Sequence, residues 1–114
     1  MISSTLIPDS GDIVWFNLDP RTGHEQSCRR PCLVLSYRSF TERTGLAVIC
    51  PITSKAKGLP FEIVLSQTKT KGVVLPIHVR SIDVAARRPK FIEKAPRSLL
   101  KNTRQYIGLI VSVV

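Results

Sequence analysis

The fold is decided by the stretch from Asp12 to Leu35, in which two apolar runs, Asp12-Ile13-Val14-Trp15-Phe16 and Cys32-Leu33-Val34-Leu35, enclose a polar loop. The runs are rich in β-branched and aromatic residues and predict two neighbouring strands. The loop contains Gly23-His24-Glu25-Gln26 and is followed four residues later by Arg30-Pro31. Loops on a rigid scaffold often carry binding and catalytic side chains, so this segment predicts a functional site. The alternative is a solvated hairpin loop.

Short apolar runs bounded by Gly, Pro, Ser and Asp recur along the chain and make strands the dominant predicted element. Most connections are short enough for antiparallel neighbours, and six short strands indicate a small β-barrel. Residues 38–44 predict a helical turn, and residues 67–72 predict a polar hairpin loop capped by Gly72. The predicted strands are residues 12–18, 31–36, 46–50, 61–65, 73–75 and 78–82.

The end of the chain changes to a helical period. After Pro96, which suits the first turn of a helix, apolar residues follow at spacings of three and four. We therefore predict an amphipathic C-terminal helix, whose β-branched end is also compatible with a short strand beginning after Gly108. The residues at helical spacing are Leu99, Leu100, Thr103, Ile107, Ile110 and Val111.

The length of 114 residues is enough for one domain, residues 1–114, and too short for two of ordinary size. A hydrophobic share of 43% excludes a chain that is disordered throughout, and no apolar run approaches the roughly 18 residues of a membrane helix. Residues 1–10 lack the basic start and apolar stretch of a secretory signal. We therefore expect a soluble, cytoplasmic protein.

The cysteines Cys28, Cys32 and Cys50 are an odd number, which is a poor disulfide framework and agrees with a reducing compartment. Cys32 and Cys50 lie in apolar runs and are expected in the core. Together with His24 and His78, the cysteines match none of the zinc patterns in which paired ligands lie two to four residues apart. We expect no metal site and no cofactor.

The charge of the chain points to a polyanionic partner. Seventeen Lys and Arg against eight Asp and Glu give a formal net charge of +9, and a basic surface is typical of proteins that bind nucleic acid. An acidic protein partner would suit the same charge. The basic residues cluster at Arg29-Arg30, Lys55–Lys57, Lys69–Lys71, Arg80, Arg87–Lys90 and Lys94–Arg104.

A series of short blocks, in order over nearly the whole chain, carries a family resemblance. The blocks are Gly11-Asp12-Ile13-Val14-Trp15, Leu18-Asp19-Pro20, Gly23-His24-Glu25-Gln26, Arg30-Pro31, Leu33-Val34-Leu35-Ser36, Pro51-Ile52-Thr53-Ser54, Lys57-Gly58, Pro60-Phe61-Glu62 and Gly72-Val73-Val74-Leu75. In these residues the chain resembles the MazF/PemK (Kid) toxin family. The resemblance implies a mainly β fold, a small SH3-like antiparallel barrel of the CcdB/PemK type with a C-terminal helix. It also implies a homodimer and a ribosome-independent, metal-free endoribonuclease that a cognate antitoxin neutralises.

By position, Arg30 matches the catalytic arginine of that family, and Thr53 matches its catalytic threonine. Cleavage of RNA without metal requires activation of the 2′-hydroxyl, stabilisation of a phosphorane and protonation of the departing 5′-oxygen. The products have 2′,3′-cyclic phosphate and 5′-hydroxyl ends, as the family's known products do.

The chemistry of these side chains suggests how they divide the work. Arginine stays protonated and can donate two parallel hydrogen bonds to a phosphate, so Arg30 suits transition-state clamping better than proton removal. Glu25 and His24, with ordinary pKa values near 4.3 and 6.5, are the base candidates. Thr53 can hydrogen-bond a non-bridging oxygen, and Ser54 can share that task.

Each of these residues also has a structural alternative. Arg30 can pair with Glu25 across the hairpin, Thr53 can satisfy a turn, and His24 can be an exposed loop residue. The aromatic residues Trp15, Phe16 and Phe61 lie within strand patterns and are expected in the core rather than as stacking platforms for bases.

One departure from the family pattern concerns the strand after Gly72. Members that resemble PemK carry an acidic residue where this chain has Ile77, and a Gln where it has His78. Activity would then rest on Arg30 and Thr53, with His78 as a candidate acid or RNA-base contact. The substitution predicts a cleavage motif that differs from that of the better-known relatives.

The expected substrate is single-stranded RNA, because a duplex hides the bases and resists in-line attack. We expect it in a basic groove along the dimer interface, where the acidic tail of an antitoxin can also bind. Two rival functions remain at this point: a CcdB-like gyrase inhibitor and a non-catalytic RNA-binding barrel. The residues expected to line the groove are Gln26, Lys55, Lys57, His78 and Arg80.

Overall fold

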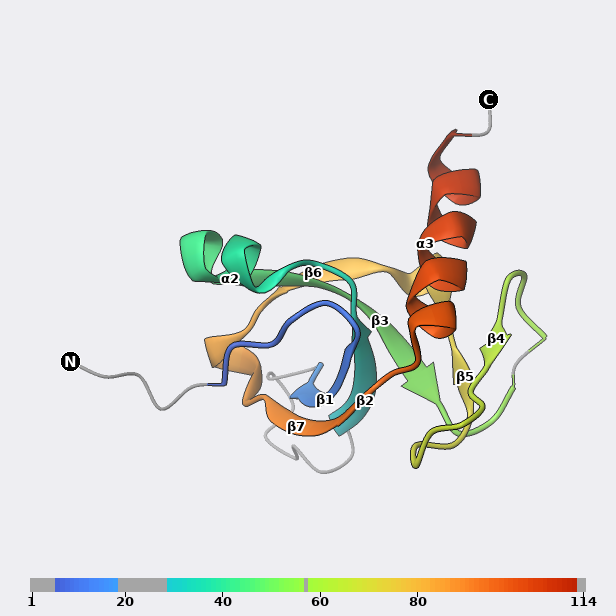
Figure 1. Cartoon of the computed structure of the whole chain (residues 1–114), viewed down its shortest axis with the longest axis horizontal. Coiled ribbons are helices and arrows are strands. Elements are labelled where there is room, and N and C mark those ends of the chain that lie inside the picture. Colours follow the sequence, from blue (N-terminus) through green and yellow to red (C-terminus); the bar gives the residue numbers. More distant parts are fainter. Residues whose placement is uncertain (1–5, 19–28, 57, 113–114) are drawn as a thin grey trace.

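The computed structural model describes residues 6–18, 29–56 and 58–112 (Figure 1). Within these residues the helices are α2 (Arg38–Thr44) and α3 (Arg97–Ser112), and two 3-10 turns are η1 (Pro76–His78) and η2 (Ala85–Arg87). The strands are β1 (Asp12–Asn17), β2 (Arg29–Val34), β3 (Leu46–Thr53), β4 (Ile63–Val64), β5 (Val73–Val74), β6 (Arg80–Asp83) and β7 (Lys90–Lys94).

The strands form one antiparallel sheet in the order β4-β5-β3-β2-β1-β7, with β6 also paired to β3. Strand β3 pairs with β2 along one edge. Along its other edge it pairs first with β6 and then with β5. Its first half pairs with β6 up to Ile49, and its last two residues, Ile52 and Thr53, pair with β5. The sheet curves into a half-barrel (Figure 1), and α3 packs against η1 and β4. The predicted class, a mainly β antiparallel barrel with a C-terminal helix, is confirmed.

Both faces of the central strands are buried. Because successive side chains of a strand point to opposite faces, Ile13 and Leu33 join one cluster, while the adjacent Val14 and Cys32 join the other. The first cluster is covered by Leu99 of α3. Cys32 and Cys50 are fully buried, as predicted from their apolar runs, and burial raises the pKa of each thiol to about 12.

Several predicted boundaries were wrong. Strand β3 runs three residues beyond Cys50 to Thr53, and the expected strand 61–65 shrinks to Ile63–Val64. His78 was expected to begin a strand but ends η1, because Pro76 starts a 3-10 turn there. Strand β7 was not predicted, since Lys90-Phe91-Ile92-Glu93-Lys94 offers little apolar alternation. The helix at residues 38–44 was predicted correctly.

The position of Phe61 differs from the prediction. Phe61 is not a core residue, because its backbone is left-handed (φ +66°), its side chain is 41% exposed, and its ring contacts Tyr106 of α3 at a centroid distance of 5.3 Å. The C-terminal segment is helical up to Ser112, so the alternative of a strand after Gly108 was wrong within the described residues. Among these residues, no helix combines the length and hydropathy that a membrane span requires.

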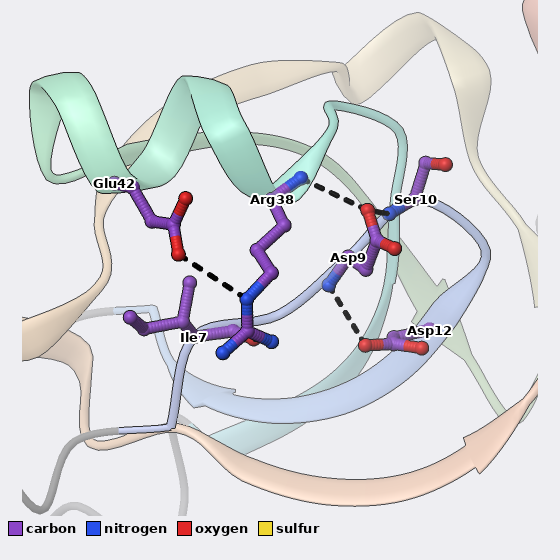
Figure 2. Close-up of polar contacts among 6 residues, drawn as sticks. All are labelled: Ile7, Asp9, Ser10, Asp12, Arg38 and Glu42. Carbon is purple, nitrogen blue, oxygen red and sulfur yellow. Dashed lines mark hydrogen bonds and ion pairs between the residues drawn. The ribbon is translucent and has the colours of Figure 1, made fainter.

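The N-terminal segment is tied to α2 by polar contacts (Figure 2). The residue before the helix, Tyr37, supplies no capping side chain; instead the Arg38 N–H donates to Asp9 Oδ1 over 2.9 Å. The same oxygen accepts the Ser10 N–H at 2.9 Å, and the Asp9 N–H donates to Asp12 Oδ2 at 2.8 Å. The hydrogen bonds from the Arg38 and Ser10 backbones lower the pKa of Asp9. A side chain distant in sequence therefore caps α2.

Candidate active site

Arg30 and Thr53 come from neighbouring strands. The pairing of strands β2 and β3 ends with Cys32 opposite Pro51, and Arg30 and Thr53 each lie two residues beyond that pair. Arg30 is exposed, whereas Thr53, the last residue of β3, is 7% exposed. Both residues line a hollow of about 240 Å³, which we call the Thr53 hollow. Its described lining is Leu18, Arg30, Pro51, Ile52, Thr53, Leu75, His78 and Arg80.

Thr53 is positioned by its own backbone and by the next strand. It pairs with Val73 of β5, and the Leu75 N–H donates to the carbonyl of Pro51 over 3.0 Å. The Thr53 hydroxyl accepts a long hydrogen bond, 3.4 Å, from the Lys55 N–H. The predicted structural alternative, a hydroxyl that satisfies a turn, is thus present. A hydroxyl has one proton to donate as well, and this contact does not use it.

His78 and Arg80 reach the same hollow from the segment after β5. His78 ends η1, and Arg80 begins β6, where it pairs with Ile49 of β3. Both side chains are exposed. Four residues that the sequence singled out, Arg30, Thr53, His78 and Arg80, therefore surround one hollow.

A second hollow of about 460 Å³ shares Arg30 and Ile52 with the first, and we call it the Trp15 hollow. Ser54 lines this hollow rather than the Thr53 hollow, and Arg30 lines both. The charge clusters Arg29-Arg30 and Lys69–Lys71 were visible in the sequence, but their meeting across the sheet was not. The described lining is Trp15, Arg29, Arg30, Pro31, Ile52, Ser54, Lys69, Thr70, Lys71 and Ile92.

Of the remaining predicted site residues, Lys55 is the one within the part of the chain that the structure describes. His24, Glu25, Gln26 and Lys57 lie outside the described residues. Lys55 is exposed and lines neither hollow, although its N–H binds the Thr53 hydroxyl.

The electrostatic character of both hollows is cationic. Every charged residue in their described linings is a lysine or an arginine. The imidazole of His78 is a further ionisable group in the lining of the Thr53 hollow. The ion pairs among the described residues lie elsewhere, between Arg38 and Glu42 and between Lys94 and Asp12. Converging guanidinium and hydroxyl groups are suited to phosphate, which accepts paired hydrogen bonds from arginine.

The fold and the site define a class of small β-barrel proteins with a C-terminal helix and a cationic hollow at the end of β3. Comparison with known proteins gives the family. The family described as "PemK-like, MazF-like toxin of type II toxin-antitoxin system" matches residues 9–111. The chain belongs to this family.

Individual relatives agree. Endoribonuclease toxin MazF of Escherichia coli K12 is 43% identical over 84 residues, which cover 74% of this chain and 76% of the relative. Endoribonuclease PemK of Escherichia coli is 32% identical over 109 residues, covering 91% of this chain and 82% of the relative. A crystal structure of MazE-MazF from Deinococcus radiodurans (Form-III) aligns with a TM-score of 0.85 at 40% identity, over 96% of this chain and 100% of the matched chain.

Proposed function

We propose that this chain is an endoribonuclease toxin that cleaves single-stranded RNA in the Thr53 hollow, in a sequence-specific and metal-independent reaction. The observation that carries the proposal is the meeting of Arg30 and Thr53 in one cationic hollow. Family membership and the endoribonuclease activity named for MazF and PemK support it.

The reaction is a transesterification. The 2′-oxygen attacks the adjacent phosphorus, the bond from phosphorus to the 5′-oxygen breaks, and the products end in a 2′,3′-cyclic phosphate and a 5′-hydroxyl. Arg30 clamps the non-bridging oxygens with two hydrogen bonds as negative charge develops. Thr53 donates its hydroxyl proton to one of the same oxygens.

Proton transfer needs a base for the 2′-hydroxyl and an acid for the 5′-oxygen. His78 lines the hollow and is the acid candidate among the described residues. Glu25 and His24 remain the base candidates from the sequence. Arg80 lines the same hollow and can bind a further phosphate, and Lys55, Lys57 and Gln26 remain candidates for RNA contacts.

The proposed partners follow from the same surface. The Deinococcus radiodurans structures pair MazF with MazE, and we propose that an antitoxin with an acidic segment neutralises this chain in the cytoplasm. We also propose that the chain acts as a homodimer. Because cationic contacts dominate, the affinity for RNA and for the antitoxin should fall as salt rises.

Cleavage and end mapping test the proposal. Purified protein is incubated with a long unstructured RNA in EDTA, cut positions are mapped by primer extension, and fragments are labelled with polynucleotide kinase without prior phosphatase. Discrete cuts whose 3′ fragments accept label directly, as 5′-hydroxyl ends do, support the proposal. RNA that is bound but uncut supports the non-catalytic barrel, and intact RNA together with inhibited gyrase supports the CcdB-like alternative.

A further inference from the structure

The Trp15 hollow combines the two surfaces that a nucleotide requires. Trp15, Pro31, Ile52 and Ile92 supply apolar wall against which a base can pack, and its volume of about 460 Å³ lies in the ordinary range for ligand sites. The charged residues of its described lining are four cations, Arg29, Arg30, Lys69 and Lys71, and hydroxyls come from Ser54 and Thr70.

The loop that carries Lys69 and Lys71 is anchored by one carboxylate. Glu93 Oε1 accepts the Lys69 N–H at 3.0 Å, and Glu93 Oε2 accepts both the Thr70 N–H and the Thr70 hydroxyl at 2.8 Å. Glu93 belongs to β7, where it pairs with Ile13 of β1, so the anchor is part of the sheet. Partial burial raises the pKa of Glu93, but these hydrogen bonds outweigh it and hold the pKa below its usual range. The anchoring group is therefore an anion at neutral pH.

Arg29 is held at the same hollow by an aromatic contact. Its guanidinium carbon lies 5.5 Å from the centroid of a Trp15 ring, within the range of a cation–π interaction. Arg29 and Arg30 are consecutive residues of β2, and both line the Trp15 hollow. The planar group also offers a face on which a base can stack.

We propose that the Trp15 hollow is a second nucleotide subsite, which binds the nucleotide next to the cleaved linkage. Lys69, Lys71 and Arg29 bind its phosphate, and the apolar wall with Trp15 packs against its base. Glu93 is a positioning residue that fixes the loop. The inference rests on the proposed function, since the RNA strand must already lie at Arg30.

Continuity with the Thr53 hollow favours RNA over an acidic peptide as the occupant. Arg30 lines both hollows. An RNA strand whose scissile phosphate contacts Arg30 in the Thr53 hollow therefore continues into the Trp15 hollow, which offers further cations. An acidic peptide would also pair with the lysines, and the binding experiment distinguishes it from RNA.

A binding experiment tests the subsite with a probe that cannot be cut. The probe is a fluorescent 2′-O-methyl oligonucleotide carrying the strongest cut sequence of the long RNA, and it is also shortened one nucleotide at a time from each end. The Lys69→Gln/Lys71→Gln protein is compared with Arg43→Gln/Arg88→Gln, an equal change of charge at exposed residues that line neither hollow.

We expect the lysine variant to bind the full probe about tenfold more weakly and to lose about 0.7 from the slope of log K against log salt, the value for one phosphate contact on a single strand. The control variant should change affinity less than about twofold at fixed salt. Removal of the nucleotide that occupies the Trp15 hollow should lower the affinity of the wild type. The same truncation should change the affinity of the lysine variant little, because the subsite of this variant is already impaired. Its single-turnover cleavage at RNA concentrations below saturation should fall in step with the affinity, because Lys69 and Lys71 bind the strand.

Identical truncation profiles in the two proteins would overturn the subsite even if cleavage is normal. Unchanged RNA affinity combined with lost binding of a polyglutamate peptide would assign the hollow to an acidic protein instead. Absence of cleavage by the wild type would instead contradict the proposed function itself. Glu93→Ala should reproduce the loss of RNA affinity and Glu93→Gln should restore part of it, whereas a purely structural role would lower thermal stability without changing the truncation profile.

Discussion

Gly72 lies directly against the backbone of Thr53. A Cβ atom built at Gly72 would overlap the Thr53 carbonyl oxygen and lie 2.8 Å from the Thr53 carbonyl carbon and 3.0 Å from Ser54 Cα. Gly72 also has a positive φ of +125°, which side chains rarely adopt. The end of β3 reaches the hollow in its observed position because residue 72 has no side chain.

Replacing Gly72 therefore should affect both stability and cleavage. Gly72→Ala combines backbone strain with a backbone overlap and should cost about 2 kcal/mol or more in the free energy of unfolding. It should also lower RNA cleavage, because the overlap displaces Thr53. Gly45→Ala is the matched control, since Gly45 has φ +76° and open space around it. It should cost about 1 kcal/mol and leave cleavage unchanged. Urea unfolding and cleavage assays measure both, and equal cleavage by the two variants would contradict the coupling.

The hydroxyl of Thr53 is expected to act on the transition state rather than on binding. Thr53→Val keeps the shape of the side chain and removes its donor, so the single-turnover rate should fall about 100-fold. Affinity for the uncut probe should change only a few-fold. Thr53→Ser retains the hydroxyl and should remain close to wild type. Equal rates for the valine and serine variants would show that the hydroxyl has no catalytic role.

Glu93 predicts a pH dependence of stability. Its pKa in the folded protein is lowered overall, because the hydrogen bonds from Lys69 and Thr70 outweigh the effect of burial. A lowered folded pKa stabilises the protein above the unfolded carboxyl pKa, and that stability is lost as pH falls through the folded value. The difference in unfolding free energy between wild type and Glu93→Gln should therefore shrink as the pH falls below the ordinary glutamate pKa of about 4.3. A difference that grows on acidification in urea titrations would contradict the anchor.

The cap that Asp9 gives to α2 is also measurable. Asp9→Ala removes the acceptor of the Arg38 and Ser10 N–H groups and should destabilise the protein by about 1 kcal/mol. Glu42→Ala, which removes the exposed partner of Arg38 on the same helix, should cost only about 0.4 kcal/mol. Thermal unfolding of both variants distinguishes them, and an equal cost would mean that Asp9 contributes no more than a surface ion pair.

The sequence predicted the parts of this fold whose signals are local. Apolar runs rich in β-branched and aromatic residues identified β1 and β2, and the helical period after Pro96 identified α3. Strand β7 lacked such a signal, because Lys90, Glu93 and Lys94 leave little apolar alternation and its pairing with β1 arises from contacts distant in sequence. The same reason explains Phe61, whose partner Tyr106 lies on another element.

For the candidate site too, the sequence predicted some residues but not the contacts that place them. Arg30 and Thr53 were found through family blocks, and they meet at one hollow just beyond the paired residues of β2 and β3. Trp15 was assigned to the core because its strand pattern is apolar, yet it is only half-buried and lines a hollow. Lys69 and Lys71 were visible as charge, but the Glu93 anchor that places them joins residues more than 20 positions apart in the chain.

The central claim is tested most directly by the single-turnover cleavage rate of Arg30→Ala, measured in EDTA at saturating protein beside Arg88→Ala. Arg88 is exposed and lines neither hollow, so it matches the lost charge without touching the site. We predict a rate at least about 1,000-fold below wild type for Arg30→Ala and an unchanged rate for Arg88→Ala. A folded Arg30→Ala protein that cuts RNA at the wild-type rate would contradict the assignment of the Thr53 hollow as the cleavage site.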